Sequence, residues 1–337
     1  MKWLALDVGG ANIKAADGQG YAQSYAFALW RDSSRLAQQI RTSISEAPPA
    51  DHLAVTMTGE LADCFESKAA GVRFILQAIS AGSDNRHTRV YLVDGRLVTP
   101  QVALTMPQLV AASNWHALAR FAARYAPAGS GLAIDVGSTT CDVIPLVDGK
   151  PVAKGTTDTQ RLLAGELVYS GVERSPVCGV TAQVPYRGQT CPVVHEMFAT
   201  MRDVYLLLDQ LPEDPALTAT ADGRPATKAA ARQRLARMIA ADGDEFNHRD
   251  AVTLAESVAD AQVSRLAAAI GKVKGSLPAA PQTIVLSGHG EFLARESLDL
   301  LQIAAACVSL TKELGPAISR SAPAHALAVL ARESTGK

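Results

Sequence analysis

The sequence predicts a duplicated α/β fold, in which two related lobes enclose a central cleft. Residues 4–10 read Leu-Ala-Leu-Asp-Val-Gly-Gly and residues 132–138 read Leu-Ala-Ile-Asp-Val-Gly-Ser, so five of the seven positions are identical. Each copy is an apolar run, a glycine-centred break and a second apolar run, the pattern of a strand, a tight turn and a strand. Strand and helix patterns then alternate along both halves, as in α/β folds. A repeat combined with this alternation indicates two halves with a cleft between them.

In the first half, hydrophobic periodicity predicts the elements in order. Residues 21–30 are expected to form a third strand. A helix is expected to begin at Ser33 or Ser34 and to end before Pro48. The later elements are a buried strand at 53–58, a helix at 68–80, a hairpin at 89–98 and a helix at 114–125. The first lobe is therefore expected to span residues 1–126.

The second half follows residues 126–131, whose alanine, proline, glycine and serine predict a hinge. After the repeated hairpin, residues 155–192 have no clear period and predict a long structured loop. The expected elements that follow are helices at 193–210, 226–241 and 249–274, a strand at 283–286 with a helix after it, a strand at 304–310 and a helix at 322–332. We expect a second lobe of residues 131–320, with a C-terminal helix at 321–337 that joins the first lobe.

Composition excludes several classes of partner. The formal net charge of −1 gives no general attraction to nucleic acid or to an anionic membrane. The start of the chain lacks the form of a signal peptide, and the longest charge-free apolar stretch, near residues 300–310, is too short to cross a bilayer. Five scattered cysteines suit a reducing compartment, so a cytoplasmic location is expected.

The repeated turns predict a site for phosphate. Glycines allow backbone N–H groups to approach an anion closely, so two facing turns would clamp a polyphosphate from both sides. Asp7 and Asp135 end the strands before these turns and are expected to hold Mg²⁺. Lys14 is either a point charge on a phosphate oxygen or an exposed strand lysine. The expected phosphate-binding residues of the turns are Gly9, Gly10, Asn12, Gly137, Ser138, Thr139 and Thr140.

The order of these segments resembles that of the superfamily of actin, sugar kinases and Hsp70 chaperones. Residues 4–14 and 132–142 are similar to its two phosphate motifs, and residues 283–294 to its adenosine motif. Its two connecting segments are similar to residues 54–60 and 322–330. The resemblance covers nearly the whole chain and implies an actin-like ATPase fold, which is ribonuclease H-like.

Within that superfamily, the second copy resembles the hydantoinase/oxoprolinase branch. Residues 135–142 read Asp-Val-Gly-Ser-Thr-Thr-Cys-Asp, similar to the Asp-x-Gly-Gly-Thr-Ser-x-Asp of that branch, whose members are much longer. Further stretches resemble a smaller family of tetrahydromethanopterin-linked C1-transfer pathway proteins, namely 165–171, 174–177, 198–200 with 203–205, and 221–225.

This second resemblance implies a transferase of methanofuran or methylofuran biosynthesis. The reaction would join an aminomethylfuran-methyl diphosphate to the phenol of tyrosine, tyramine or a glutamyl derivative, with release of pyrophosphate. Mg²⁺ is the implied cofactor, and the partners are small-molecule diphosphate and phenolic substrates. Two alternatives remain open, an ATP-dependent small-molecule kinase and a non-catalytic nucleotide-binding switch.

The resemblance also assigns candidate catalytic roles to Glu60, Asp7 and Asp142. Glu60 follows the first connecting strand, where relatives keep an acid or amide near the reacting group. A base there would take the proton of a phenol, whose reference pKa is about 10. The alternative for Glu60 is a carboxylate that bonds backbone N–H groups at a helix start. Asp142 matches the final aspartate of the hydantoinase motif and is an alternative metal or water ligand.

In the adenosine-like segment, Gly288 and Gly290 take phosphate-binding roles by resemblance. His289 stands between them where a small residue normally lies under adenine, which argues against ATP binding. His289 is therefore a candidate substrate contact, with hydrogen bonding inside the loop as the alternative.

Three further residues are candidates for substrate contact, Tyr169, Arg174 and Arg224. Arg224 precedes a basic run that either receives an anionic substrate tail or is a solvated face. Cys178, Cys191 and His195 do not have a familiar zinc spacing, so no metal role is assigned to them.

Overall fold

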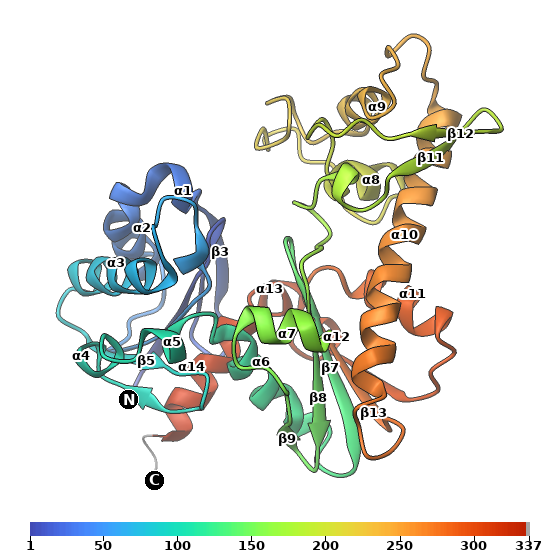
Figure 1. The fold of residues 1–337 in the computed structure, drawn as a ribbon. Coiled ribbons are helices and arrows are strands. Elements are labelled where there is room, and N and C mark those ends of the chain that lie inside the picture. The colour runs from blue at the N-terminus through green and yellow to red at the C-terminus, as the bar shows by residue number, and fades with distance from the viewer. Residues whose placement is uncertain (335–337) are drawn as a thin grey trace.

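The computed structural model describes residues 1–334, and it has two lobes that lie side by side (Figure 1). The sheet of the first lobe has the strand order β3-β2-β1-β4-β5-β6. Its strands are β1 (Trp3–Val8), β2 (Asn12–Ala16), β3 (Ala22–Ala26), β4 (His52–Met57), β5 (His87–Tyr91) and β6 (Leu97–Val98).

The sheet of the second lobe repeats this arrangement in the order β10-β8-β7-β13-β14, and β9 pairs with β8. In each lobe the predicted hairpin is antiparallel, and its first strand pairs in parallel with a later strand. The strands are β7 (Ser130–Val136), β8 (Cys141–Val147), β9 (Lys150–Pro151), β10 (Leu167–Val168), β13 (Thr283–Ser287) and β14 (Ala306–Ser309). The predicted duplicated fold of the actin-like ATPase class is therefore confirmed.

The helices cover these sheets and fill the space between them. Those of the first half are α1 (Leu29–Asp32), α2 (Leu36–Ser45), α3 (Lys68–Gly82), α4 (Pro100–Ala103), α5 (Pro107–Val110) and α6 (Asn114–Ala122). Those of the second half are α7 (Asp158–Ala164), α8 (Met201–Leu207), α9 (Lys228–Arg237), α10 (His248–Lys274), α11 (Glu291–Leu300), α12 (Leu310–Leu314), α13 (Pro316–Arg320) and α14 (Ala322–Ser334). None of the helices within residues 1–334 is long and apolar enough to span a membrane.

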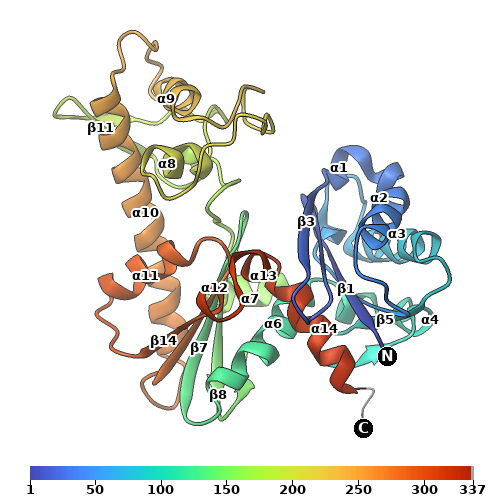
Figure 2. The same cartoon turned by 180° about the vertical axis from the view of Figure 1, so that it is seen from behind.

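Two helices tie the lobes together, α6 and α14, which lie between the two sheets (Figure 2). Helix α6 follows the first sheet in the chain but packs on the second, where Trp115 joins a core that contains Ala133 and Ile144. Helix α14 packs on the first sheet, where Leu327 shares a core with Trp3. The predicted C-terminal segment 321–337 includes residues 335–337, which lie outside the described residues.

The second lobe carries a distal subdomain at the far end of α10 (Figure 1). Helix α10 begins with a capping box, in which the side chain of Asn247 accepts from the amide of Asp250 at 3.0 Å. Its buried face packs on the second lobe and on α8, α9 and the small sheet of β11 (Gln183–Tyr186) and β12 (Gln189–Pro192). The subdomain core is therefore continuous with the core of the second lobe.

The structure differs from the sequence prediction in four segments, the first being the expected strand at 21–30, of which only β3 is a strand and Leu29–Asp32 form α1. The expected loop at 155–192 contains α7, β10, β11 and β12, and the expected helix at 193–210 is helical only over 201–207. Helix α7 has its own signals, because Thr157 forms a capping box and Gly165 ends the helix with a positive φ of 80°. Residues 33–35 form a 3₁₀ turn, so neither predicted serine caps α2.

Candidate active site

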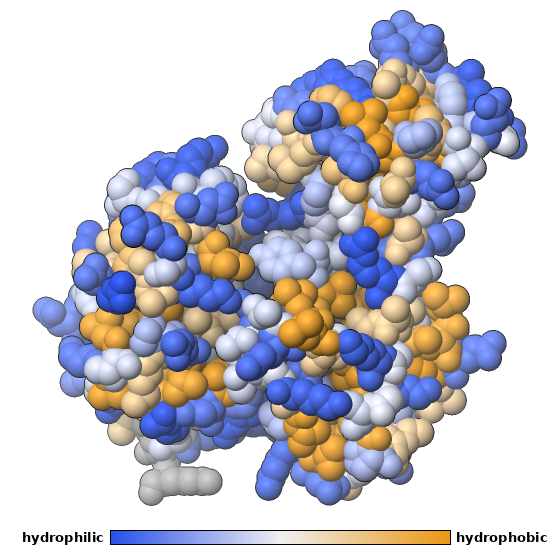
Figure 3. All heavy atoms as spheres, in the orientation of Figure 1, coloured by the Kyte–Doolittle hydropathy of each residue, from blue (hydrophilic) through white to orange (hydrophobic). Residues whose placement is uncertain are grey.

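A cleft of about 520 Å³ lies between the lobes, and both repeated turns line it. Figure 3 shows a recess at this place between the lobes. Thirteen predicted site residues line the cleft: Asp7, Gly9, Gly10, Asn12, Lys14, Asp135, Gly137, Ser138, Thr139, Thr140, Asp142, Tyr169 and Arg174. The sequence prediction that the two turns share one cavity is therefore confirmed.

The first turn directs its carbonyls into the protein. The Gly9 amide closes the turn by donating to the carbonyl of Asn12 at 2.9 Å, and the Gly10 carbonyl accepts from the amide of Leu29 at 2.9 Å. The Gly10 and Ala11 amides have no acceptor among residues 1–334. Peptide N–H groups that lack a protein partner beside a cavity are suited to bind an anion.

The second turn repeats this orientation. The Gly137 amide donates to the carbonyl of Thr140 at 2.9 Å. The Ser138 carbonyl accepts from the amides of Glu173 and Arg174 at 3.1 and 2.8 Å. Within the described chain, the Ser138 and Thr139 amides donate to no protein acceptor. Two turns of the same design therefore offer unused donors to one cleft.

The charges of the two hairpins differ. In the first hairpin Asp7 lies directly opposite Lys14. At the equivalent position of the second hairpin, Asp142 lies opposite Asp135. Like charges directly opposite each other are destabilising, so this pair requires compensation.

Arg161 of α7 supplies that compensation, and the sequence prediction did not include it. Its guanidinium donates to Asp142 at 2.5 Å and lies 4.2 Å from the ring centroid of Trp115. The Arg161 side chain is only 2% exposed. The capping signals around 157–165 were the available sequence signal for α7, but they do not indicate the partner of Arg161.

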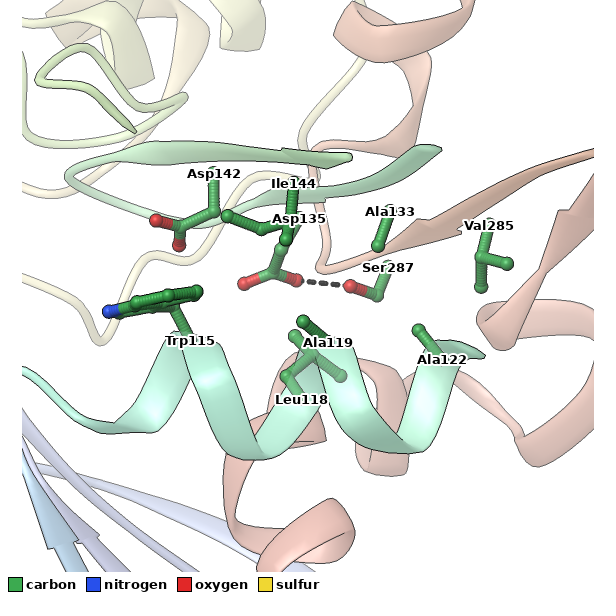
Figure 4. A pocket seen from close by; sticks show the side chains of 10 residues that line it. All are labelled: Trp115, Leu118, Ala119, Ala122, Ala133, Asp135, Asp142, Ile144, Val285 and Ser287. Carbon is green, nitrogen blue, oxygen red and sulfur yellow. Dashed lines mark hydrogen bonds between the residues drawn. The ribbon is translucent and has the colours of Figure 1, made fainter. Parts of the chain in front are cut away.

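Burial, together with the charge of nearby Asp142, raises the pKa values of Asp7 and Asp135. Desolvation raises the pKa of Asp7, and Lys14 partly opposes it. Desolvation and then the charge of Asp142 raise the pKa of Asp135 to about 6. Ser287 donates to Asp135 at 2.5 Å, and Figure 4 shows Asp135 and Asp142 pointing toward Trp115 on α6. The close approach of these carboxylates, which repel one another, therefore favours a bound cation.

The carboxylates of Asp7 and Asp135 suit a hard cation that also binds water molecules or phosphate oxygens. Asp7 is 4% exposed, and its Oδ1 atom has no hydrogen-bond partner within residues 1–334. Among these residues no group of three or more His, Cys, Asp or Glu side chains is placed to hold a metal ion. Mg²⁺ usually takes one or two carboxylates together with water and phosphate oxygens, so Asp7 and Asp135 suit it. Cys178, Cys191 and His195 do not form a metal-binding cluster within the described chain.

Glu60 lies beside the cleft, in the 3₁₀ turn Gly59–Leu61. It is 1% exposed, and within residues 1–334 neither carboxylate oxygen receives a well-formed hydrogen bond. Desolvation raises its pKa to about 7, and the amides of Glu60 and Ala112 offset this only in part. The next residue, Leu61, lines the cleft. Glu60 is therefore a buried acid one residue from the cavity wall.

The predicted residues of the adenosine-like segment do not line the cleft. Gly290 donates its amide to the carbonyl of Val136 at 3.1 Å, and the Gly288 amide donates to Ser319 at 3.1 Å. A Cβ atom on Gly288 would lie 2.2 Å from the Val136 carbonyl oxygen. These glycines therefore allow the loop after β13 to pack against the end of β7.

His289 belongs to an ionic cluster below the second turn. Its Nε2 atom lies 3.1 Å from Glu173, which also pairs with Arg202 at 2.7 Å and Arg320 at 3.1 Å. The hydrogen bond from His289 and the charges of Arg320 and Arg202 lower the pKa of Glu173 despite its burial, whereas burial lowers the pKa of His289 itself. The cluster holds the segment whose amides bind Ser138.

Arg224 lies in the distal subdomain and not at the cleft. It pairs with Asp222 at 3.0 Å and bonds the side chain of Gln233. Asp222 also pairs with Arg234, a fully buried side chain that binds Asp203 at 2.7 Å. The basic run is therefore partly a structural network of this subdomain.

Fold and site together define a two-lobed α/β protein whose repeated turns and buried carboxylates suit a phosphate group with a cation. The family model for hydantoinase/oxoprolinase matches residues 51–334, and the chain belongs to this family. The family resemblance predicted from the sequence is thereby confirmed.

Two curated proteins are similar along the chain. Each is named (4-{4-[2-(gamma-L-glutamylamino)ethyl]phenoxymethyl}furan-2-yl)methanamine synthase. The one from Methanocaldococcus jannaschii is 28% identical over 337 residues, 99% of this chain and 98% of that protein. The one from Methanococcus vannielii is 28% identical over 199 residues, 58% of this chain and 88% of that protein.

Among solved structures, (R)-2-hydroxyglutaryl-CoA dehydratase component A from Acidaminococcus fermentans has a TM-score of 0.46 and 11% identity. The match covers 100% of both chains. No activity follows from a similarity of this degree.

Proposed function

We propose that this protein is a transferase that joins an aminomethylfuran-methyl diphosphate to a phenol, and that it acts in methanofuran or methylofuran assembly. The compound in the relatives' name contains a phenoxymethyl group on a furan, which is an aryl ether of a furan-methyl carbon. Membership of the hydantoinase/oxoprolinase family and the similarity along 99% of the chain support an enzyme of this kind.

One observation carries the proposal: two turns of the same design present unused N–H groups to a single cleft that also contains buried carboxylates. A diphosphate has oxygens on two phosphorus atoms, so each turn can bind one end of it. Asp7 and Asp135 would hold Mg²⁺, which supplies positive charge beside the departing diphosphate. Preorganised donors of this kind stabilise charge that develops on a leaving group.

The reaction exchanges one carbon–oxygen bond for another. The bond between the methylene carbon and the diphosphate oxygen breaks, and its electron pair leaves with the diphosphate. The phenol oxygen forms the new bond to the same carbon, and its proton passes to a base. The electron-rich furan stabilises positive charge on the methylene, so bond breaking can run ahead of bond making.

Glu60 is the proposed base. Burial raises its pKa to about 7, near neutral pH, and neither carboxylate oxygen receives a well-formed hydrogen bond within residues 1–334. Asp142 is less suited to this role, because Arg161 already binds it at 2.5 Å. Asp142 is then the residue that orients Arg161 at the cleft.

A two-substrate assay tests the proposal. Pyrophosphate release is expected only when furan-methyl diphosphate, a phenol and Mg²⁺ are all present. Asp7→Ala is expected to lower the rate about 100-fold, and Asp260→Ala, a change at an exposed position of α10, serves as the matched control. Micromolar binding of Mg-ATP without condensation would instead favour the ATP-dependent kinase or the nucleotide switch.

A further inference from the structure

Trp30 differs from Trp3 and Trp115 because its side chain is exposed at the cleft. Trp3 and Trp115 are 4% and 3% exposed, whereas Trp30 is 43% exposed and lines the cleft. Trp30 follows Leu29, whose amide donates to the Gly10 carbonyl of the first turn at 2.9 Å. A large aromatic face is therefore held beside the first turn by the backbone.

A cation from the other lobe covers that face. The Cζ atom of Arg174 lies 4.7 Å from the centroid of the Trp30 ring. The Arg174 amide donates to the Ser138 carbonyl of the second turn at 2.8 Å. Within residues 1–334 the Arg174 guanidinium forms no ion pair and no hydrogen bond. Its contact with the Trp30 indole is a cation–π interaction. Each partner is thus attached to one turn, and the two meet across the cleft.

We propose that Trp30 and Arg174 form the subsite for the ring that carries the diphosphate, an inference that rests on the proposed transfer reaction. When a diphosphate occupies the turns, the Arg174 guanidinium leaves the indole and binds a phosphate oxygen. The uncovered indole face then receives the furan ring and the positive charge that develops on its methylene.

The chemistry of both side chains supports this exchange. Arginine binds phosphate oxygens through two parallel N–H groups, which is a stronger contact than a guanidinium on an exposed ring. The face of tryptophan is the best among aromatic side chains for attracting a cation. The indole forms no bond in the reaction, because the electron pair of the broken bond leaves with the diphosphate. Trp30 therefore acts only through its ring charge distribution.

The wall around this pair suits an organic ring more than a second phosphate. Three further exposed apolar or aromatic side chains line the same cleft, Leu61, Tyr169 and Met197. They line the cavity together with Trp30, and none of them belongs to the two hairpins that carry Asp7, Asp135 and Lys14. The cleft therefore offers both ionic and apolar side chains, which a diphosphate ester of an aromatic alcohol requires.

Tryptophan fluorescence tests the first step without any turnover. Titration with inorganic pyrophosphate and Mg²⁺ is expected to change the emission of the wild type in a saturable way. Trp30→Phe should remove most of the change and leave only a small response from Trp115, which lies beside Asp135 and Arg161, and Arg174→Gln should weaken pyrophosphate binding about tenfold. Arg187→Gln, which removes a similar contact with Tyr186 in the distal subdomain, is the control and should respond as the wild type. An unchanged emission in the wild type, or the same response in Trp30→Phe, overturns the proposal.

Steady-state kinetics test the second step. Trp30→Leu keeps an apolar side chain but removes the aromatic face, so kcat should fall roughly 30-fold, while Trp30→Phe should keep most of it. A normal kcat in Trp30→Leu overturns the subsite and leaves the transferase intact. Pyrophosphate-dependent fluorescence with no condensation by the wild type overturns the transferase, and with it the role of Trp30 in transfer.

Discussion

At the level of single residues, the two hairpins have the same backbone and different charges. Asp7 faces Lys14 in one, and Asp135 faces Asp142 in the other. A diphosphate between them would therefore meet one carboxylate and a lysine from the first hairpin and two carboxylates from the second. The duplicated site is therefore asymmetric, because Lys14 supplies a positive charge in the first hairpin where the second hairpin has Asp142.

Substitution of Arg161 should lower the free energy of unfolding, because Asp135 and Asp142 then repel each other without a neighbouring cation. Arg161→Gln leaves Asp142, which is 14% exposed, opposite Asp135 without its cation, and loss of the buried partner of such a pair costs about 3 kcal/mol. The free energy of unfolding, measured by urea denaturation, should fall by that amount. Adding Asp142→Asn to the same chain should restore most of the loss. Equal stability of the single and double variants would show that the repulsion is unimportant.

Glu60 should make stability depend on pH. Its pKa is raised from 4.5 to about 7, so the folded protein binds this proton more tightly than the unfolded chain does. The charged carboxylate therefore lowers stability above pH 7, by roughly 3 kcal/mol, and has no such effect below pH 4.5. Glu60→Gln should be more stable than the wild type at pH 8, and this advantage should vanish near pH 4.5.

The same variant should lose most of the condensation activity, since the proposed base is gone. Thermal unfolding at several pH values, together with the pyrophosphate assay, measures both effects. Glu256→Gln, at an exposed position of α10, is the control. A Glu60→Gln variant that is less stable than the wild type at pH 8 would contradict the burial argument.

At the level of elements, the segment 170–175 supports the second turn. Gly171 packs so closely that a Cβ atom would lie 2.4 Å from the Thr139 amide nitrogen. The following amides bind the Gly137 and Ser138 carbonyls. The position of the anion donors therefore depends on a segment that the chain reaches only after α7 and β10.

Gly171→Ala should displace the second turn and weaken pyrophosphate binding by about tenfold or more, because a backbone atom cannot move aside. Isothermal titration calorimetry with Mg²⁺ present measures the change. Gly271→Ala on α10 is the matched control, since no atom lies within 4 Å of its added Cβ, and it should stabilise the helix by about 1 kcal/mol. Unchanged affinity in Gly171→Ala would mean that the turn does not hold the anion.

The repeated hairpins were predictable because strand and turn signals are local. The register of Asp7 with Lys14 follows from a tight turn of known length. The partners of Asp142 and Trp30 were not predictable, because Arg161 and Arg174 come from a segment without a clear period. Trp30 itself was expected in a strand, but it lies in α1, where the chain turns back to bind the first turn. Local pattern thus indicates the anion-binding turns, while the side chains around them depend on tertiary contacts.

At the level of the whole molecule, the lobes are joined at their base and in contact at the cleft. The α6 and α14 helices fill the base between the sheets (Figure 2). Across the cleft, Lys68 at the start of α3 pairs with Asp158 at the start of α7 at 2.6 Å. Together with the contact between Arg174 and Trp30, this pair connects the two lobes beside the site. The arrangement is suited to a hinge at the base that opens and closes the cleft.

Loss of the pair between Lys68 and Asp158 should therefore affect closure more than stability. Its side chains are 38% and 16% exposed, and surface pairs contribute about 0–1 kcal/mol, so Lys68→Gln should hardly change the unfolding temperature. The open form should become more populated, and the KM for the diphosphate substrate should rise about threefold, since binding must then also close the lobes. Small-angle scattering should show a larger radius of gyration for the free variant, and Mg²⁺ with pyrophosphate should restore the wild-type value.

A matched control distinguishes closure from a general loss of charge. Arg124 and Glu333 form an exposed pair at 2.6 Å, away from the cleft, so Arg124→Gln should change neither the KM nor the radius. Because salt screens exposed charges, the wild-type KM should also rise with ionic strength, and the KM of Lys68→Gln should rise less. If Lys68→Gln and Arg124→Gln behave alike, the lobes do not depend on this contact, and closure must come from the bound diphosphate alone.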